Sequence, residues 1–386
     1  MPSNLLKKQY HFYWLILSFL AIIIINSCSS DQQDDSGALD IREPSNMHLS
    51  ARAVIDSMEA GFNLGNTFDN GKQSTTPASI YPIIDLYHQA GMKHIRIPVT
   101  WMDGFGGNTL ADVNGTVNFE HPRFIQLKAV IDYALDKELF VVINAHHEHW
   151  LKDNYDGSAK FNQPFSHLWQ EIANYFKDYP VQLIFEVLNE PEGTMGQWSG
   201  DFPKPTDSLA LAYTREINKV GYDAIRGAGG QNASRIIMVA PNGQGNQSMF
   251  DETYPTQASL PGNGTDPYLA IQVHTYDPWN FAGQDGSNKN YPGDDEIAAN
   301  ILKVAAHADK LGVPVNYGEF GVGRRDNREE RDTELVRGFY RTIKETTLEE
   351  DMSFTPWDDR GWFGLITRDG LGEYQFVYDL VPSMME

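Results

Sequence analysis

The chain contains one cysteine and far fewer basic than acidic side chains. Its 386 residues include 30 Lys and Arg against 52 Asp and Glu, for a formal net charge of −22 at pH 7. Nucleic-acid binding needs clustered Lys and Arg, so this acidic surplus argues against a nucleic-acid partner. A single cysteine, Cys28, excludes a disulfide within the chain. A neutral or cationic ligand fits this composition better.

Two further absences restrict the fold. No G-x-G-x-x-G motif follows the first expected strand, which disfavours an open doubly wound sheet, although that sheet remains the alternative architecture. No internal repeat is present, and no low-complexity segment lies beyond a short acidic stretch near the N-terminus. With 41% hydrophobic and 12% aromatic residues, the chain can bury a large core as one barrel or as two smaller domains.

Residues 1–27 have the composition of a targeting signal. Lys7 and Lys8 precede an apolar run over residues 12–25, and the segment ends in INSC at Cys28. This pattern resembles the signal of bacterial lipoproteins, in which the peptide is removed and the cysteine is acylated. The resemblance implies a lipidated Cys28. The alternative is an uncleaved transmembrane anchor, for which the run is shorter than the roughly 20 residues that span a membrane.

Residues 28–50 are polar, acidic and poor in apolar side chains, so they are predicted to form a flexible tether. Acidic residues directly after the cysteine resemble the surface-export signals of some Gram-negative lipoproteins. We therefore expect an outer-membrane lipoprotein at the cell surface, with a periplasm-facing orientation as the alternative. The lipid is expected to be the only contact with the membrane.

Strand-like and helix-like segments alternate from residue 51 to the end of the chain. Apolar and β-branched runs predict eight strands, at 61–66, 94–99, 140–146, 183–190, 235–241, 269–276, 313–320 and 353–358. Amphipathic segments separate them, and several end in glycine as helices often do. Doubly buried strands that alternate with helices form parallel sheets, and eight units suit a closed (β/α)8 TIM barrel. Residues 51–386 are thus predicted to be one α/β domain of this class.

Polar residues occur where the expected strands end, which is where a barrel of this type carries its chemistry. The predicted ends supply Asn66, Arg96, His146, Asn189, Glu190, His274, Tyr276, Glu319 and Trp357. Glu190 and Glu319 are the acids that close the fourth and seventh predicted strands, and both can point over the same central space. Two carboxylates about 5–5.5 Å apart are the arrangement of a retaining glycosidase.

Seven segments together resemble glycoside hydrolase family 5 of clan A, the family of the cellulases. They are GFNLGNTFD, HIRIPVTW, INAHHEHW, FEVLNEP, VHTYDPWNF, YGEFG and TPWDD, in this order over roughly residues 55–365. The resemblance implies that Glu190 is the acid/base and that Glu319 is the nucleophile.

Elementary electrostatics assigns expected roles to the neighbours of this pair. Arg96 would place a positive charge near Glu319 and Tyr276 would donate to it, and both would lower the pKa of Glu319. Glu190 would need a raised pKa, from nearby negative charge and partial burial, to donate a proton. Asn189 can donate to the sugar 2-hydroxyl, a contact that strengthens in the transition state.

Histidines after the third strand leave two interpretations open. By resemblance, His146 and His274 line the sugar subsite above Trp357, the apolar floor, and His147 is a further candidate to bind substrate. Alternatively, His147 and His149 form an H-x-H pair, as in metal-dependent amidohydrolases of the same fold. The fifth strand ends without a histidine ligand, so we expect no metal and no cofactor.

Seven of the eight tryptophans follow the N-terminal signal. Trp169 shares a helical face with Ile172, Ala173 and Phe176 and is predicted to lie in the core. The others are predicted to stack on pyranose rings, with loop packing as the alternative: Trp101, Trp150, Trp198, Trp279, Trp357 and Trp362.

The predicted function is that of a monomeric, retaining endo-β-1,4-glucanase that cuts β-glucan polysaccharides or oligosaccharides by a two-glutamate double displacement. The alternatives within the family are a xyloglucanase, a mannanase or a xylanase. VHTYDPWNF with FNLGNTFD favours the glucanase and xyloglucanase branches. A glycan-binding surface lipoprotein without catalysis is the alternative outside the enzymes.

Overall fold

The structure is a computed structural model that describes residues 49–386 except 105–108. The predicted signal peptide over 1–27, Cys28 and nearly all of the predicted tether over 28–50 therefore lie outside the described residues. Within them, no helix is long and apolar enough to cross a membrane.

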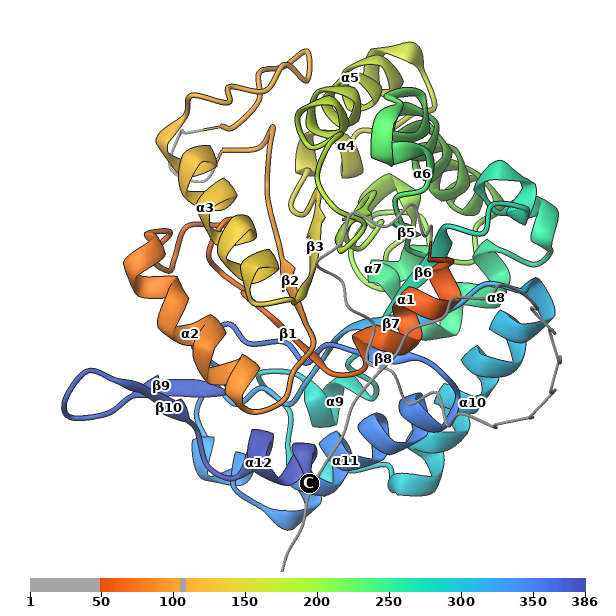
Figure 1. Ribbon diagram of the computed structural model, residues 1–386. Coiled ribbons are helices and arrows are strands. Elements are labelled where there is room, and N and C mark those ends of the chain that lie inside the picture. Colours follow the sequence, from red (N-terminus) through yellow and green to blue (C-terminus); the bar gives the residue numbers. More distant parts are fainter. Residues whose placement is uncertain (1–48, 105–108) are drawn as a thin grey trace, which may run out of the picture. The chain divides into compact units, whose positions relative to one another are not determined.

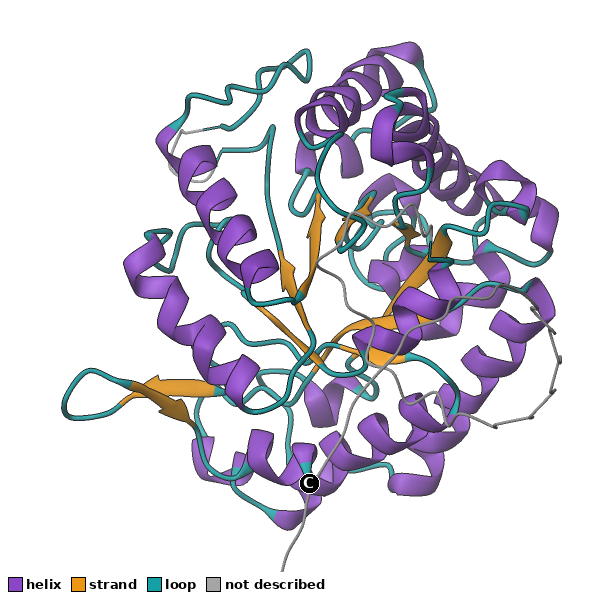
Figure 2. Cartoon of the chain, viewed as in Figure 1, coloured by secondary structure: helices purple, strands orange, loops and turns teal. Residues whose placement is uncertain are grey.

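Eight strands form one sheet in the order β1 to β8, and each neighbouring pair is parallel (Figures 1 and 2). A parallel bridge between Ala60 and Phe354 links the last strand to the first and nearly closes the barrel. Helices surround the strands in both figures. The prediction of a (β/α)8 TIM barrel is confirmed.

The eight barrel strands occur in the predicted order, and their residues are buried on both faces. Most end earlier than predicted, because the chain leaves the sheet before the polar residues that follow. Their bounds are β1 Gly61–Asn63, β2 His94–Ile97, β3 Phe140–Asn144, β4 Leu183–Glu186, β5 Ile237–Val239, β6 Leu269–Thr275, β7 Val315–Phe320 and β8 Ser353–Phe354.

Long helices separate most of the strands, and short helices lie in the loops that follow them. Their bounds are α1 Ala51–Met58, α2 Pro77–Gln89, α3 Pro122–Asp136, α4 His149–Lys152, α5 Ala159–Tyr175, α6 Ser208–Gly227, α7 Asn242–Gly245, α8 Phe250–Thr253, α9 Trp279–Ala282, α10 Asp294–Leu311, α11 Glu334–Glu349 and α12 Leu380–Met385. Among the 3-10 turns, η1 spans Gly193–Met195 and η3 spans Gln247–Met249.

Local sequence explains where the long helices begin and end. The hydroxyl of Thr333 accepts from the backbone N–H of Val336 and caps the first turn of α11. Helix α10 starts with Asp294, Asp295 and Glu296, whose charges favour the positive end of the helix dipole. It ends at Gly312, which adopts the left-handed conformation with φ of 70°.

Helix α1 covers the amino-terminal end of the barrel. Val54, Ile55 and Met58 of α1 pack in one buried cluster with residues near the starts of β3 to β6, such as Ile184. The N–H of Ala51 also donates to the carbonyl of Pro267, just before β6. Apolar packing thus closes this end of the barrel. The active site is therefore expected at the opposite end, where the strands have their carboxyl ends.

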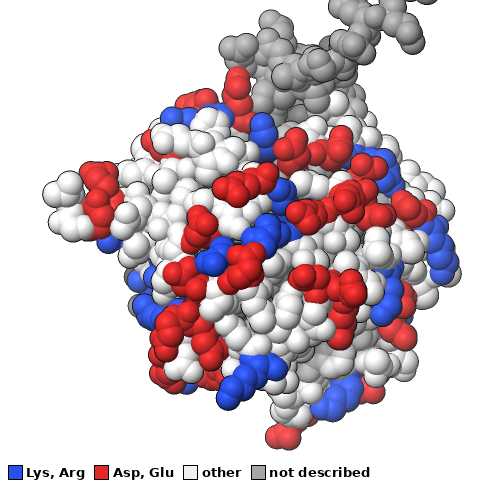
Figure 3. All heavy atoms as spheres, turned by 90° about the horizontal axis from the view of Figure 1, so that it is seen from below, with Lys and Arg blue, Asp and Glu red and all other residues white. Residues whose placement is uncertain are grey.

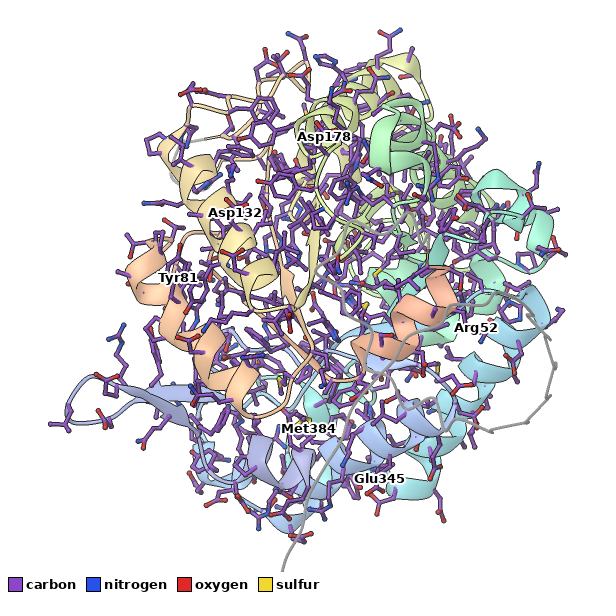
Figure 4. All side chains as sticks on the ribbon, in the orientation of Figure 1. Arg52, Tyr81, Asp132, Asp178, Glu345 and Met384 are labelled. Atoms are coloured by element: carbon purple, nitrogen blue, oxygen red, sulfur yellow. The ribbon has the colours of Figure 1, made fainter. Side chains whose placement is uncertain are left out.

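Polar contacts and aromatic stacking join neighbouring outer helices. Tyr81 of α2 and Asp132 of α3 are labelled in Figure 4. The ring of Tyr81 stacks on that of Tyr133 of α3, with centroids 3.8 Å apart. Asp132 pairs with Lys128 at 2.6 Å and accepts from the hydroxyl of Tyr179 at 2.8 Å. These contacts fix the α2 and α3 layer outside β1 to β3.

Two features lie outside the predicted barrel pattern. An antiparallel hairpin, β9 Ile366–Arg368 and β10 Tyr374–Phe376, follows the last barrel strand and protrudes beside α2 (Figure 1). On the face shown in Figure 3, acidic side chains are interspersed with basic ones, and no continuous basic stripe crosses it.

Candidate active site

The segment that carries Asn189 and Glu190 is a loop rather than the end of a strand. Strand β4 stops at Glu186, and Glu190 has a φ of 45°. This corrects the prediction of a strand through Glu190, because a left-handed residue cannot continue a strand. The loop is held in place by the indole of Trp169, which donates to the carbonyl of Val187 at 3.0 Å. The bend lifts Glu190 above the sheet, so its carboxyl group faces the cleft.

Arg96 of β2 lies at the centre of the buried polar network. Its Nη1 donates to Glu319 Oε1 at 2.6 Å and to Asn63 Oδ1 at 2.9 Å. Its Nη2 donates to Asn189 Oδ1 at 2.7 Å. The guanidinium is fully buried and thus joins strands β1, β2 and β7 to the loop after β4. The buried guanidinium is therefore surrounded by hydrogen-bond acceptors, as burial of a charge requires.

Glu186 is a member of this network that sequence reasoning missed. It is fully buried and accepts from Arg96 Nε at 2.7 Å and from Arg96 Nη2 at 2.8 Å. The signal was present in the sequence, because an acid within the apolar run LIFEV can be buried only if it has a charged partner. Asn63 of β1 is another member: its amide donates to the carbonyl of Gly318 at 2.8 Å.

The two glutamates of the expected pair lie on either side of one histidine. His274 Nδ1 is 2.9 Å from Glu190 Oε1 and 3.8 Å from Glu319 Oε2. One carboxylate oxygen of each glutamate and a ring nitrogen of His274 all lie within 4.8 Å of one another. The hydroxyl of Tyr276 donates to Glu319 Oε2 at 3.1 Å. The structure therefore brings together Glu190, Glu319, His274 and Tyr276, from β6, β7 and the segments that follow β4 and β6.

The pKa values of the two carboxyl groups are shifted by different neighbours. Burial, and to a smaller extent the nearby charge of Glu192, together raise the pKa of Glu190 to about 7. Burial also raises the pKa of Glu319, while His274 and Arg96 act in the opposite direction. The expected net lowering of the Glu319 pKa was therefore wrong, because desolvation outweighs the attraction of Arg96. The expected raised pKa of Glu190 agrees with the structure.

Two buried imidazoles border the site in their neutral form. Burial lowers the pKa of His274 to about 4 and holds the pKa of His146 well below its usual value. The ring of His146 is parallel to the indole of Trp357, with centroids 6.0 Å apart and an interplanar angle of 4°. Trp357 packs against the backbone at Gly65, where a Cβ atom would lie 2.7 Å from the indole. The flat surface of Trp357 suits the apolar face of a sugar ring.

His147 contacts a different partner from the one that the H-x-H interpretation requires. Its Nε2 is 3.5 Å from Asp69 Oδ2. Asp69, His146 and His147 offer ligand atoms within 4.8 Å of one another, whereas His149 is outside this group. Asp69 also interacts electrostatically with Arg123, whose positive charge disfavours a metal ion there. The donor set thus differs from that of the amidohydrolase alternative.

Among the described tryptophans, two are buried in the core, three line the cleft and two do neither. Trp101 is fully buried, and its indole donates to the carbonyl of Asn144, so the prediction that it stacks on sugar was wrong. Trp169 lies in the core as predicted. The indole of Trp150 donates to the buried Glu148 at 2.9 Å, which holds it in the loop after β3. Trp198, Trp279 and Trp357 line the cleft, whereas Trp362 stacks with Arg325 outside its lining.

The cleft over the carboxyl ends of the strands has a volume of about 1370 Å³. Its lining includes His146, His147, Glu190, His274, Tyr276, Glu319 and Trp357. A parallel eight-stranded barrel with two carboxyl groups and aromatic rings in such a cleft defines the class of barrel glycosidases.

The chain belongs to glycosyl hydrolase family 5, whose cellulase model matches residues 56–358. Endoglucanase B of Ruminococcus albus is 31% identical over 299 residues, which cover 73% of this chain and 67% of that protein. Endoglucanase A of Clostridium longisporum is 30% identical over 354 residues, which cover 84% of this chain and 64% of that protein. The chain thus spans about two thirds of the length of these curated relatives.

Solved structures share the fold. A broad-specificity endoglucanase from Clostridium longisporum aligns with a TM-score of 0.70 at 24% identity, over 87% of this chain and 97% of that chain. The complex of a family 5 lichenase mutant from Caldicellulosiruptor sp. F32 with cellotetraose aligns with a TM-score of 0.69 at 25% identity, over 87% of this chain and 95% of that chain.

Proposed function

We propose that this glycosidase is an endo-β-1,4-glucanase that hydrolyses β-glucan with retention of anomeric configuration. The observation that carries the proposal is the spacing of Glu190, His274 and Glu319 within 4.8 Å, which suits a nucleophile and an acid/base on one sugar ring. The names of the relatives support the choice of a glucan. The open cleft and its exposed indoles suit an internal segment of a long chain.

In the first step of the proposed mechanism, Glu319 attacks the anomeric carbon and forms a glycosyl ester. The bond to the leaving oxygen breaks, and Glu190 gives that oxygen its proton. A pKa of about 7 keeps much of Glu190 protonated near neutral pH. Arg96 and Tyr276 hold Glu319 by its two oxygens, so its position before attack is fixed.

In the second step, Glu190 removes a proton from a water molecule that attacks the same carbon and releases Glu319. Formation of the ester removes the negative charge of Glu319, and this charge raises the pKa of Glu190 while it is present. Glu190 therefore becomes a stronger acid after the first step and can act as a base. Asn189 accepts from Arg96 through Oδ1, which leaves its amide N–H groups to donate to the sugar 2-hydroxyl.

The nucleophile can be identified by trapping. A 2-deoxy-2-fluoro cellobioside with an activated leaving group should label Glu319, because fluorine slows release of the ester. Glu319→Gln should lower kcat on a soluble β-glucan by on the order of 10⁴-fold or more while the protein remains folded. Mass spectrometry of peptic peptides locates the label. A label on another residue, with Glu319→Gln still active, would overturn the assignment.

The preferred polysaccharide can be decided by initial rates on soluble cellulose derivatives, mixed-linkage glucan, xyloglucan, xylan and glucomannan. We expect the highest kcat/KM on a β-1,4-linked glucan backbone. A clear preference for xylan or glucomannan would replace the glucanase with the corresponding alternative. Absence of hydrolysis on the whole panel, with binding retained, would support the glycan-binding alternative.

We also propose that the chain is an outer-membrane lipoprotein, anchored through Cys28 and exposed at the cell surface. The support is the sequence alone: two lysines, an apolar run, INSC and an acidic segment. Polysaccharides do not readily cross an outer membrane, so an enzyme that cuts them would be useful outside it. The barrel would then act as a monomer on a flexible tether.

A further inference from the structure

Glu186 is a third carboxylate below the cleft that the proposed mechanism does not use. It closes β4, is fully buried and accepts two hydrogen bonds from one guanidinium, that of Arg96. Asn144 of β3 donates to it at 3.2 Å, and the amide of Asn144 also lies 3.1 Å from His146 Nδ1. His274 also interacts electrostatically with Glu186, and burial lowers the pKa of His274 to about 4. A buried carboxylate is costly, so this position has a task that an apolar residue could not perform.

Arg96 is shared between Glu186 and Glu319. Its Nε and Nη2 donate to Glu186, and its Nη1 donates to Glu319 at 2.6 Å. The guanidinium carries one positive charge and keeps its proton at every pH at which the protein is folded. One cation thus faces two anions in an interior of low dielectric constant. Because Glu186 offsets part of the charge of Arg96, the net electrostatic attraction on Glu319 is weaker than that of an undivided cation.

The other titratable groups around Glu319 do not replace this charge. His274 of β6 is 3.8 Å from it and lowers the pKa of Glu319 when it is protonated, but burial lowers the pKa of His274 itself to about 4, so His274 carries no charge above that pH. Tyr276 donates a neutral hydrogen bond, and its own pKa is raised well above the usual value by burial and by Glu319. Glu190 raises the pKa of Glu319 by repulsion. Among these contacts of the described residues, Arg96 supplies the full positive charge.

We propose that Glu186 is a positioning residue for the reaction. It binds Arg96 through Nε and Nη2, which keeps Nη1 aligned on Glu319, and it offsets part of the positive charge, which keeps Glu319 nucleophilic. The inference rests on the proposed role of Glu319. A carboxylate that pairs with an undivided cation ionises at lower pH but attacks more slowly, because nucleophilicity falls with basicity. Glu186 therefore keeps the pKa of Glu319 higher than Arg96 alone would, and so preserves its nucleophilicity.

The test is the pH dependence of the trapping rate with a dinitrophenyl 2-deoxy-2-fluoro-β-cellobioside. Dinitrophenolate leaves without a proton, so the acid limb of this profile reports ionisation of Glu319, and the plateau reports its nucleophilicity. In Glu186→Gln, the acid limb should move to lower pH by on the order of one unit. The plateau rate should fall about tenfold, because Glu319 loses both basicity and alignment.

Glu148→Gln is the matched control, because Glu148 is also fully buried but contacts the loops rather than Arg96. It accepts from the N–H of Trp101 at 2.7 Å and from the indole of Trp150 at 2.9 Å. Thermal unfolding should show a loss of stability in both variants. A shift of the acid limb to lower pH that is clearly larger in Glu186→Gln than in Glu148→Gln supports the proposal.

An acid limb that stays in place or moves to higher pH in Glu186→Gln would overturn it. Should that variant fail to fold, Glu186→Asp carries the test: its carboxylate lies further from Arg96, so the acid limb should move in the same direction by a smaller amount. An unchanged or raised limb in Glu186→Asp then overturns the proposal. Failure of the proposed function would appear separately, as the absence of a label on Glu319 in the wild-type protein.

Discussion

At the residue scale, the proposed reaction depends on the different surroundings of two glutamates. Glu319 is held by a cation and a phenol, whereas Glu190 lies beside a neutral imidazole and near another carboxylate. These surroundings suit a nucleophile that remains in position and an acid that loses its proton near neutral pH. Two predictions address Glu190 directly.

Removal of the Glu190 carboxyl group should affect substrates according to their leaving groups. Glu190→Ala should lower kcat/KM on polysaccharide by about 10²–10⁴-fold, because the departing oxygen needs a proton. Aryl glycosides with acidic phenols should be much less affected in the first step. Added azide should restore turnover of these substrates and give a β-glycosyl azide, which NMR can identify. An α-azide product would contradict the retaining mechanism.

Glu192 should set the alkaline limb of the pH profile. Its negative charge raises the pKa of Glu190, and Lys152, 3.5 Å from Glu192, acts in the opposite direction. Glu192→Gln leaves the charge of Lys152 unopposed, so the pKa of Glu190 should fall. The alkaline limb of kcat/KM should therefore move to lower pH. Glu373→Gln, an exposed position on the β9–β10 hairpin, is the control. An alkaline limb that coincides in the two variants would show that Glu192 does not act on Glu190.

At the element scale, the loop after β4 places Glu190 and the segment after β8 places Trp357, whereas Glu319 lies within β7 itself. Strand β4 ends four residues before Glu190, and β8 ends three residues before Trp357. The alternation of apolar residues predicts where strands lie but continues beyond their ends, because loop residues above a barrel can be equally buried. Val187 and Leu188 are both fully buried although they lie outside β4. Strand ends were therefore the least predictable feature.

Gly65, after β1, should be essential for the position of Trp357. A Cβ atom there would lie 2.7 Å from the indole and 2.8 Å from the carbonyl oxygen of Asp358. Gly65→Ala should displace the loop after β8, lower kcat/KM on soluble glucan at least about tenfold and cost about 1–3 kcal/mol of unfolding free energy. Gly370→Ala is the matched control, since its Cβ would meet no atom within 4 Å. Equal kinetics and equal urea midpoints for the two variants would contradict this packing role.

At the scale of the whole molecule, the proposed anchor and the barrel should be separable. Cys28→Ala should release or mislocalise the protein, while the barrel remains active on soluble glucan. Deletion of residues 1–50 should give a folded enzyme, because α1 begins at Ala51 and every described strand is retained. Fractionation of cells, with protease added outside, measures both position and exposure. Continued membrane attachment of Cys28→Ala would favour an uncleaved transmembrane helix, and protection from protease would favour the periplasm.

The sequence by itself determined the barrel, the order of its eight strands, the family and the residues that gather at one end. These features depend on local hydrophobic patterns and on short motifs, and both can be recognised in the sequence alone. Tertiary structure alone decided that Glu186 shares Arg96 with Glu319, that Glu192 acts on Glu190 and that Trp101 is buried. It also decided that burial raises the pKa of Glu319. These outcomes depend on distances between segments far apart in the chain and on the exclusion of water around them, which no local pattern encodes.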